Sequence, residues 1–337
     1  MMFTRTARNP RLDFLVGAAS LWISWAFFID AWSHENLPYE NFFTWAHGLI
    51  YGGMLALVGV LVVMRKEIPQ AYRVPLIGVP IFVLGGVADL GWHTFFGIET
   101  GVDIILSPTH ETIGLGLMLV SSAPLFSALR YRSEMRTLRD QLPMLFSVAS
   151  WLVMIHFATA YAMDPAAGIV NAPPDANSFS VNYFTATAIT YYKLVGGIVV
   201  LLLESFIMAS FALFVASRFN LRPGALTLLL VLGNTLPALP FTNDSPLLVT
   251  IFAMSLIAGI VGDTLIAWMG DLPHPASRFC VYAAAVPATY VAVYMLAIAL
   301  TGGSWWDWSV RTSLVIFAGV IGLGLSLLML PGDGTTA

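Results

Sequence analysis

Two stretches of this sequence place aspartate and histidine at matching intervals inside otherwise apolar surroundings. In each stretch an aspartate precedes a histidine by four residues, a glutamate follows that histidine by six, and a second histidine opens the next apolar segment. The first copy holds Asp30, His34, Glu40 and His47, and the second holds Asp89, His93, Glu99 and His110. Ionisable side chains at membrane depth are costly, so they usually mark function. The matched order indicates an internal repeat that carries a functional site.

The residue types in the repeat favour metal binding. An aspartate and a histidine four residues apart lie on one face of a helix, so both can point at a common centre. Imidazole and carboxylate ligands without sulfur suit copper, zinc, iron or manganese. The chain has one cysteine, Cys280, which excludes a thiolate-rich cluster. We predict six metal ligands: Asp30, His34, His47, Asp89, His93 and His110.

Further polar residues accompany these ligands. A ligating histidine normally donates its second ring N–H to a carboxylate or a carbonyl. Such supporting groups, or additional ligands, are Glu40, Glu99, Asp103, Glu111 and His156. Ser107 and Pro108 are typical of an N-cap and a first helical residue, which would hold His110 in the first turn of a helix. Glu204 and Asp263 interrupt apolar runs and are either a proton path or hydrogen-bonded packing residues.

The elements that must position these residues are membrane helices. Hydrophobic residues make up 58% of the 337 residues, charged residues 10%, and the mean hydropathy is +0.81. Soluble domains contain about 25% charged residues. Apolar runs long enough to cross a bilayer recur along the chain. We predict an all-α polytopic integral membrane protein with about ten transmembrane helices: 13–33, 42–64, 74–95, 108–129, 143–163, 190–217, 224–241, 246–269, 279–301 and 309–330.

The spans indicate a single membrane domain over residues 1–337. Residues 13–129 form two repeated helical hairpins, from helices 1–2 and 3–4, that carry the metal site. Residues 163–192 are rich in Pro, Gly, Asn and Asp, which is typical of an irregular outer loop and a possible cap.

The basic residues set the expected orientation. With the N-terminus inside, the inner segments hold 13 of the 15 Lys and Arg residues, and only Lys193 and Arg311 fall outside. This bias follows the positive-inside rule and supports an even number of spans. We predict cytoplasmic N- and C-termini in a bacterial inner membrane, with the metal site toward the periplasm.

The second copy resembles a metal-binding segment found in a membrane-embedded chain of the copper membrane monooxygenases, the particulate methane and ammonia monooxygenase family. That segment has an aspartate, a Trp-His pair and a proline-containing turn before a second histidine, as do Asp89, Trp92, His93, Pro108 and His110. The first copy lacks the Trp-His pair but keeps the spacing Asp-x3-His-x12-His. The resemblance covers about 25 residues of each hairpin and implies a copper site formed by Asp89, His93 and His110.

The chain also departs from that family. It has no soluble copper-binding domain, and no Asn-x3-His element follows the second copy, since Leu152 stands four residues before His156. The sequence thus leaves two functions open. One is an oxygen-dependent oxidase or monooxygenase that holds copper, or else iron or zinc, and acts on a small apolar substrate. The other is metal transport or metalloenzyme assembly.

The expected partners follow from the same reasoning. They are the lipid bilayer, an electron donor or companion membrane protein, and a second copy in a homo-oligomer. No nucleic acid is expected.

Overall fold

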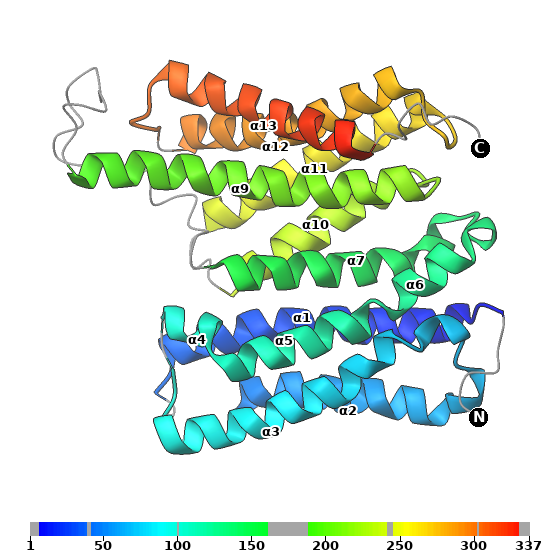
Figure 1. Cartoon of the computed structure of the whole chain (residues 1–337). Helices are drawn as coiled ribbons and strands as arrows, with labels where there is room; N and C mark the ends of the chain where they lie inside the picture. The colour runs from blue at the N-terminus through cyan, green and yellow to red at the C-terminus, as the bar shows by residue number, and fades with distance from the viewer. Residues whose placement is uncertain are drawn as a thin grey trace. The chain divides into compact units, whose positions relative to one another are not determined.

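A computed structural model describes residues 7–38, 42–99, 101–160, 188–240, 245–301 and 303–329. The regular elements in these ranges are helices (Figure 1). Among the described residues, nine helices are long and apolar enough to cross a membrane. The chain is therefore a helical protein of the multi-pass membrane type, in which each helix satisfies its own backbone hydrogen bonds.

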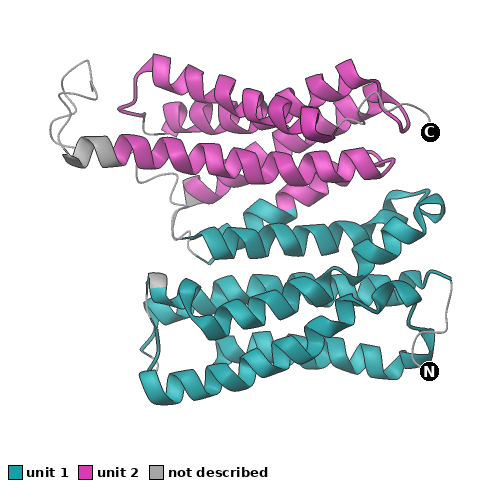
Figure 2. Ribbon diagram, viewed as in Figure 1, with its two compact units in different colours: residues 1–161, 232–243 teal, residues 162–231, 244–337 magenta. Residues whose placement is uncertain are grey.

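The chain divides into two compact units (Figure 2). Unit 1 contains residues 1–161 and 232–243 and includes both copies of the repeat. Its long helices are α1 (Pro10–Asn36), α2 (Trp45–Val63), α3 (Gly78–Phe96), α5 (Pro108–Ser121) and α7 (Leu138–Thr159). Its short helices are α4 (Val102–Leu106), α6 (Ala123–Arg130) and the 3-10 turns η1 (Arg65–Glu67), η2 (Gln70–Tyr72), η3 (Pro75–Ile77) and η4 (Arg132–Glu134).

Each copy of the repeat forms one helical hairpin. The first copy is α1 with α2, and the second is α3 with α5, with α4 in the connection between them. Helix α1 also packs against α5 and α7, so the two hairpins share one bundle (Figure 1). Glycine allows the close approach of α3 and α5, because a Cβ at Gly116 would lie 2.5 Å from the backbone nitrogen of Phe82.

One of the predicted spans is interrupted and another is shorter than predicted. The span 108–129 is confirmed as a candidate membrane span, Pro108–Arg130, which consists of α5 and α6 separated at Ser122, two residues before Pro124. The segment predicted as span 224–241 forms α10 (Ala225–Ala238), a helix of 14 residues. At 1.5 Å per residue such a helix is about 21 Å long, shorter than the roughly 30 Å hydrocarbon core. Its hydropathy resembles that of a span, but its length does not.

Unit 2 contains residues 162–231 and 244–337. Its helices are α9 (Ala188–Arg218), the first half of α10, α11 (Ser245–Met269), α12 (Ala276–Thr301) and α13 (Trp308–Met329). Helix α12 packs against α9, α11 and α13. Most of the predicted outer loop, residues 163–187, lies outside the described residues.

A buried ion pair anchors the start of α1. Arg8 Nε donates to Asp13 Oδ2 at 3.0 Å, and the hydroxyls of Tyr72 and Ser127 donate to the same carboxylate at 2.8 and 2.9 Å. Arg8 also donates to the backbone oxygen of Asp140 at 2.7 Å. Burial and the Asp13 carboxylate raise the pKa of Tyr72 well above its ordinary value of 10, which keeps its hydroxyl a donor. The network ties α1 to η2, α6 and α7 at the end of unit 1 where its basic residues gather.

Candidate metal centre

The six predicted ligands lie together at the other end of these helices. They form two groups, and within each group the ligand atoms lie within 4.8 Å of one another. One group is His47, Asp89, His93 and His110, and the other is Asp30, His34 and His47. All six are buried, with exposed fractions between 0 and 7%. Because His47 belongs to both groups, the two copies of the repeat build one shared cluster.

The local structure of the two copies is matched. In each copy the aspartate and first histidine lie near the C-terminal end of a helix, α1 or α3. The second histidine is the third residue of the next helix, His47 in α2 and His110 in α5. Helix α2 begins after the N-cap Thr44, whose hydroxyl accepts the backbone N–H of His47 at 3.0 Å. As predicted, Ser107 is the N-cap residue of α5 and Pro108 its first residue.

Each of the four imidazole rings is oriented through Nδ1. His47 Nδ1 donates to the backbone oxygen of Phe42 at 2.6 Å, and His110 Nδ1 donates to that of Ile104 at 2.6 Å. His93 Nδ1 faces the oxygen of Gly97 at 3.2 Å, and His34 Nδ1 faces that of Glu99 at 3.1 Å. A backbone carbonyl only accepts, so Nδ1 carries a proton, and in a neutral imidazole Nε2 is then the nitrogen with a lone pair.

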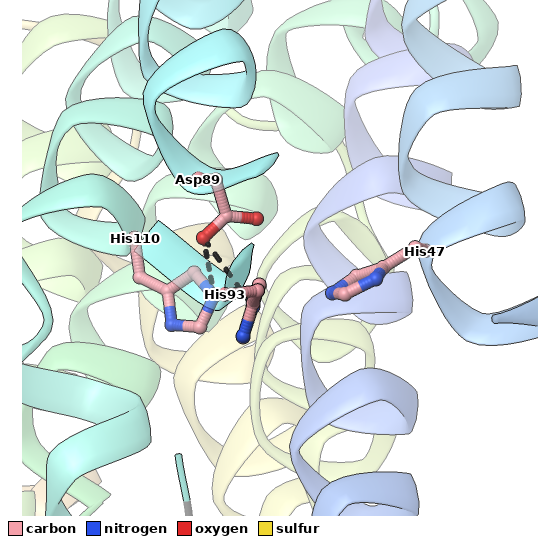
Figure 3. A group of neighbouring side chains, drawn as sticks. All are labelled: His47, Asp89, His93 and His110. Carbon is pink, nitrogen blue, oxygen red and sulfur yellow. Dashed lines mark ion pairs between the residues drawn. The ribbon is translucent and has the colours of Figure 1, made fainter. Parts of the chain in front are cut away.

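The Nε2 atoms point toward the two carboxylates. Asp30 Oδ2 lies 3.5 Å from His34 Nε2 and 3.4 Å from His47 Nε2. Asp89 Oδ1 lies 3.6 Å from His93 Nε2 and 3.2 Å from His110 Nε2. Figure 3 shows the rings of His93 and His110 beside Asp89, with His47 approaching from a neighbouring helix.

Three hydroxyl groups complete the surroundings of Asp89. The Tyr51 hydroxyl donates to Asp89 Oδ2 at 3.0 Å, and the Thr109 hydroxyl donates to Asp89 Oδ1 at 2.9 Å. Ser107 lies 2.8 Å from the Thr109 hydroxyl. The sequence prediction did not include Tyr51 or Thr109. The four-residue spacing between His47 and Tyr51 could have indicated Tyr51, since it places both on one helix face.

The predicted supporting residues have different surroundings. Glu99 lies beside the cluster, with Oε2 3.5 Å from His93 Nδ1. Asp103 and Glu111 are exposed, and Glu40 lies outside the described residues. His156 faces Asn234 Oδ1 through Nε2 at 3.0 Å and belongs to neither ligand group.

The two residues of the predicted proton path belong to unit 2. Glu204 is a half-buried residue of α9. Asp263 on α11 accepts the backbone N–H groups of Leu226 and Thr227, both at 3.1 Å, and the Thr227 hydroxyl at 2.6 Å. Asp263 therefore acts as an N-cap for α10, because its carboxylate satisfies N–H groups in the first turn of that helix.

The donor set fits a transition metal. Nitrogen and oxygen ligands without thiolate match copper, zinc or iron, and histidines tied through Nδ1 to carbonyls match the usual support of ligating imidazoles. In the described part of the chain, Nε2 of His47, Nε2 of His93 and Oδ1 of Asp30 are buried without a hydrogen-bond partner. A buried polar atom without a partner costs free energy, and a bound cation would remove that cost. Comparison of this chain with protein-family models, curated proteins and solved structures found no match.

Proposed function

We propose that this protein is a membrane metalloprotein whose His/Asp cluster holds transition-metal ions. The observation that carries the proposal is the shared orientation of the four imidazoles. Each ring directs Nδ1 to a backbone oxygen and Nε2 to a carboxylate of the cluster. Packing alone would not require four histidines from four helices to expose the same nitrogen to one centre.

Charge supports the same proposal. Among the described residues, Asp30 pairs with histidines and Asp89 with histidines and hydroxyls, and neither pairs with Lys or Arg. If the imidazoles are neutral, two buried negative charges need compensation, and isolated buried carboxylates are very costly. Metal cations would supply it. Protonated histidines are the competing source of positive charge, as in a proton relay, and metal analysis separates the two.

The proposed reaction class is the oxygen-dependent oxidation of a small apolar substrate, with copper as the favoured metal. A bound transition metal would supply dioxygen binding or Lewis acidity. A cavity of about 130 Å³ lies beside His110, and its lining includes Leu115, Met118, Met154 and Phe157. Its size and apolar side chains suit a small molecule that partitions into lipid. Electrons would come from a quinol or a companion membrane protein.

The alternative role, metal transport or metalloenzyme assembly, requires ligands that exchange readily. The burial of all six residues, at most 7% exposed, favours a resident metal over a cargo. In the proposed topology the cluster faces the periplasm, since 13 of the 15 basic residues belong to the segments assigned to the cytoplasmic side.

Metal analysis of the full-length protein tests the proposal. Wild type and the double variant His93→Ala/His110→Ala are purified without chelators, loaded with Cu²⁺, Fe²⁺ or Zn²⁺ and passed through a desalting column. Wild type should retain stoichiometric metal, and the double variant should lose most of it. His274→Ala is the matched control and should retain metal, because His274 belongs to neither ligand group and faces the backbone oxygen of Ala216 within unit 2. A wild-type protein that retains no metal after loading contradicts the proposal.

A further inference from the structure

The two copies of the repeat differ in how they hold their carboxylates. Both oxygens of Asp89 accept hydrogen bonds from hydroxyl groups, Oδ2 from Tyr51 and Oδ1 from Thr109. Among the described residues no hydroxyl group donates to Asp30, and its Oδ1 is buried without a hydrogen-bond partner. The ligands and the carbonyl groups that orient the imidazoles are duplicated, but in the described part of the chain the hydroxyl groups that support the carboxylate are not.

The residues at matching positions of the two copies explain this difference. Tyr51 stands four residues after His47 in α2 and reaches across to the aspartate of the other copy. The matching position, four residues after His110 in α5, is Gly114, which has no side chain to offer Asp30. Thr109 directly precedes His110, whereas the residue before His47 is Ala46. Both hydroxyl donors are therefore missing from the first copy for reasons visible in the sequence.

The two ligand groups also differ in the number of ligands, and the group that contains Asp89 is again the better equipped. His47, Asp89, His93 and His110 supply four donors within 4.8 Å, the number that fills a tetrahedral coordination sphere. The other group adds only Asp30 and His34, because the single lone pair of His47 Nε2 binds one ion. A metal held there keeps a position for a small exogenous ligand. A cavity of about 10 Å³ among Asp30, His47, Asp89 and His110 offers room on the scale of one water molecule.

We propose that the cluster contains two inequivalent metal positions. The position at Asp89 is filled first and tightly, because Tyr51 and Thr109 hold its carboxylate in place before metal arrives. The position at Asp30 is filled second and exchanges more readily, and it is the one open to a water-sized ligand. Tyr51 is a positioning residue that acts through Asp89. This inference rests on the proposed function, since it requires that the cluster bind metal.

The test is a Co²⁺ titration of the full-length protein in detergent. Calorimetry and the visible absorption of the bound ion measure the affinity and number of the binding steps. Wild type should bind two ions in steps that differ at least about tenfold in affinity. Asp30→Asn should remove the weaker step and retain the tighter one, and Asp89→Asn should remove the tighter step. Tyr51→Phe should weaken the tighter step by about 10–100-fold and leave the weaker step unchanged, as expected when a group that supports a ligand is lost.

The controls separate positioning from folding. Tyr282→Phe removes the hydroxyl of another buried tyrosine, one that donates to the backbone oxygen of Ala212 in unit 2, and should leave both steps unchanged. Thr109→Val removes the second donor with little change in volume and should reproduce the effect of Tyr51→Phe if that variant does not fold.

Several outcomes would overturn the inference while metal binding itself stands. They are one bound ion, two steps of equal affinity, or variants of Asp30 and Asp89 that weaken both steps alike. The inference would also fail if Tyr51→Phe weakened the second binding step as much as the first. No Co²⁺ binding by wild type would contradict the proposed function, and the inference would fail with it.

Discussion

His34 and Glu99, which belong to different copies of the repeat, are joined by a hydrogen bond of 3.1 Å from His34 Nδ1 to the Glu99 backbone oxygen. The loop of the second hairpin therefore orients a histidine of the first. Tyr51 makes the reciprocal link from α2 to Asp89 of α3. Each hairpin therefore supports one ligand of the other, so the two copies of the repeat depend on each other for the orientation of their ligands.

The turn after α3 should be sensitive to substitution at Gly97. Gly97 has φ of +86° and ψ of −174°, a region that is essentially restricted to glycine and costs other residues about 1–3 kcal/mol, and its carbonyl oxygen accepts from His93 Nδ1. We expect Gly97→Ala to lower the free energy of unfolding by that amount and to reduce metal retention. Thermal denaturation and metal content of the same preparation measure both effects.

Gly91 in α3 provides the matched control. A Cβ at Gly91 would meet nothing within 4 Å, and alanine favours a helix interior by about 0.5–1 kcal/mol over glycine. Gly91→Ala should therefore be neutral or stabilising and should retain metal. Equal behaviour of the two variants would show that the Gly97 turn does not position His93.

Metal affinity should fall as the solution becomes acidic. Binding requires the lone pair of Nε2, and four of the proposed ligands are imidazoles whose unperturbed pKa is about 6.5. Protons therefore compete with metal, so the apparent affinity should decrease progressively as the pH is lowered. Equilibrium titrations with Co²⁺ from acidic to mildly alkaline pH measure this, with helical content monitored by circular dichroism. A metal affinity that does not change with pH would contradict ligation through the imidazole Nε2 atoms.

The ion pair at the opposite end of α1 should stabilise the fold without affecting the metal. Arg8→Ala leaves the Asp13 carboxylate buried without its cationic partner, which typically costs about 3–5 kcal/mol. Asp13 and Asp30 are 17 residues apart on α1, about 25 Å along the helix, so metal binding by the folded protein should be unchanged.

Chemical denaturation measures the loss of stability, and metal content shows whether the cluster at the other end of α1 is unaffected. Arg11→Ala is the control for the loss of one charge, because Arg11 is exposed and its removal should cost at most about 0.5 kcal/mol. A folded Arg8→Ala protein that has lost its metal would contradict the separation.

The sequence predicted the helical class, the repeat and the residues that gather in the cluster, because all three depend on local spacing. Aspartate and histidine four residues apart share a helix face wherever the helix lies. Ser107 and Pro108 similarly indicated where α5 begins. The backbone oxygens that orient the imidazoles could not be predicted, since they depend on loop conformations, such as that of Phe42 before α2.

Contacts between distant segments could not be predicted from the sequence either. Asp89 and Tyr51 are 38 residues apart, and nothing local shows that their helices bring them together. The length of α10 was overestimated because hydropathy does not report where a helix ends. Whether Glu204 and Asp263 carry protons stays a prediction, although Asp263 has a structural role that hydropathy alone could not indicate.

That role of Asp263 can be tested by comparing two substitutions. Its carboxylate accepts two backbone N–H groups and one hydroxyl at the start of α10. Removing an N-cap acceptor costs about 0.5–2 kcal/mol, so Asp263→Ala should lower the free energy of unfolding within that range. Asp263→Asn retains one acceptor oxygen and should lose less. If Asp263→Ala is as stable as wild type, capping is not what keeps a carboxylate at this position. If Asp263→Asn is stable but impairs proton-coupled turnover, the same side chain serves the predicted proton path as well.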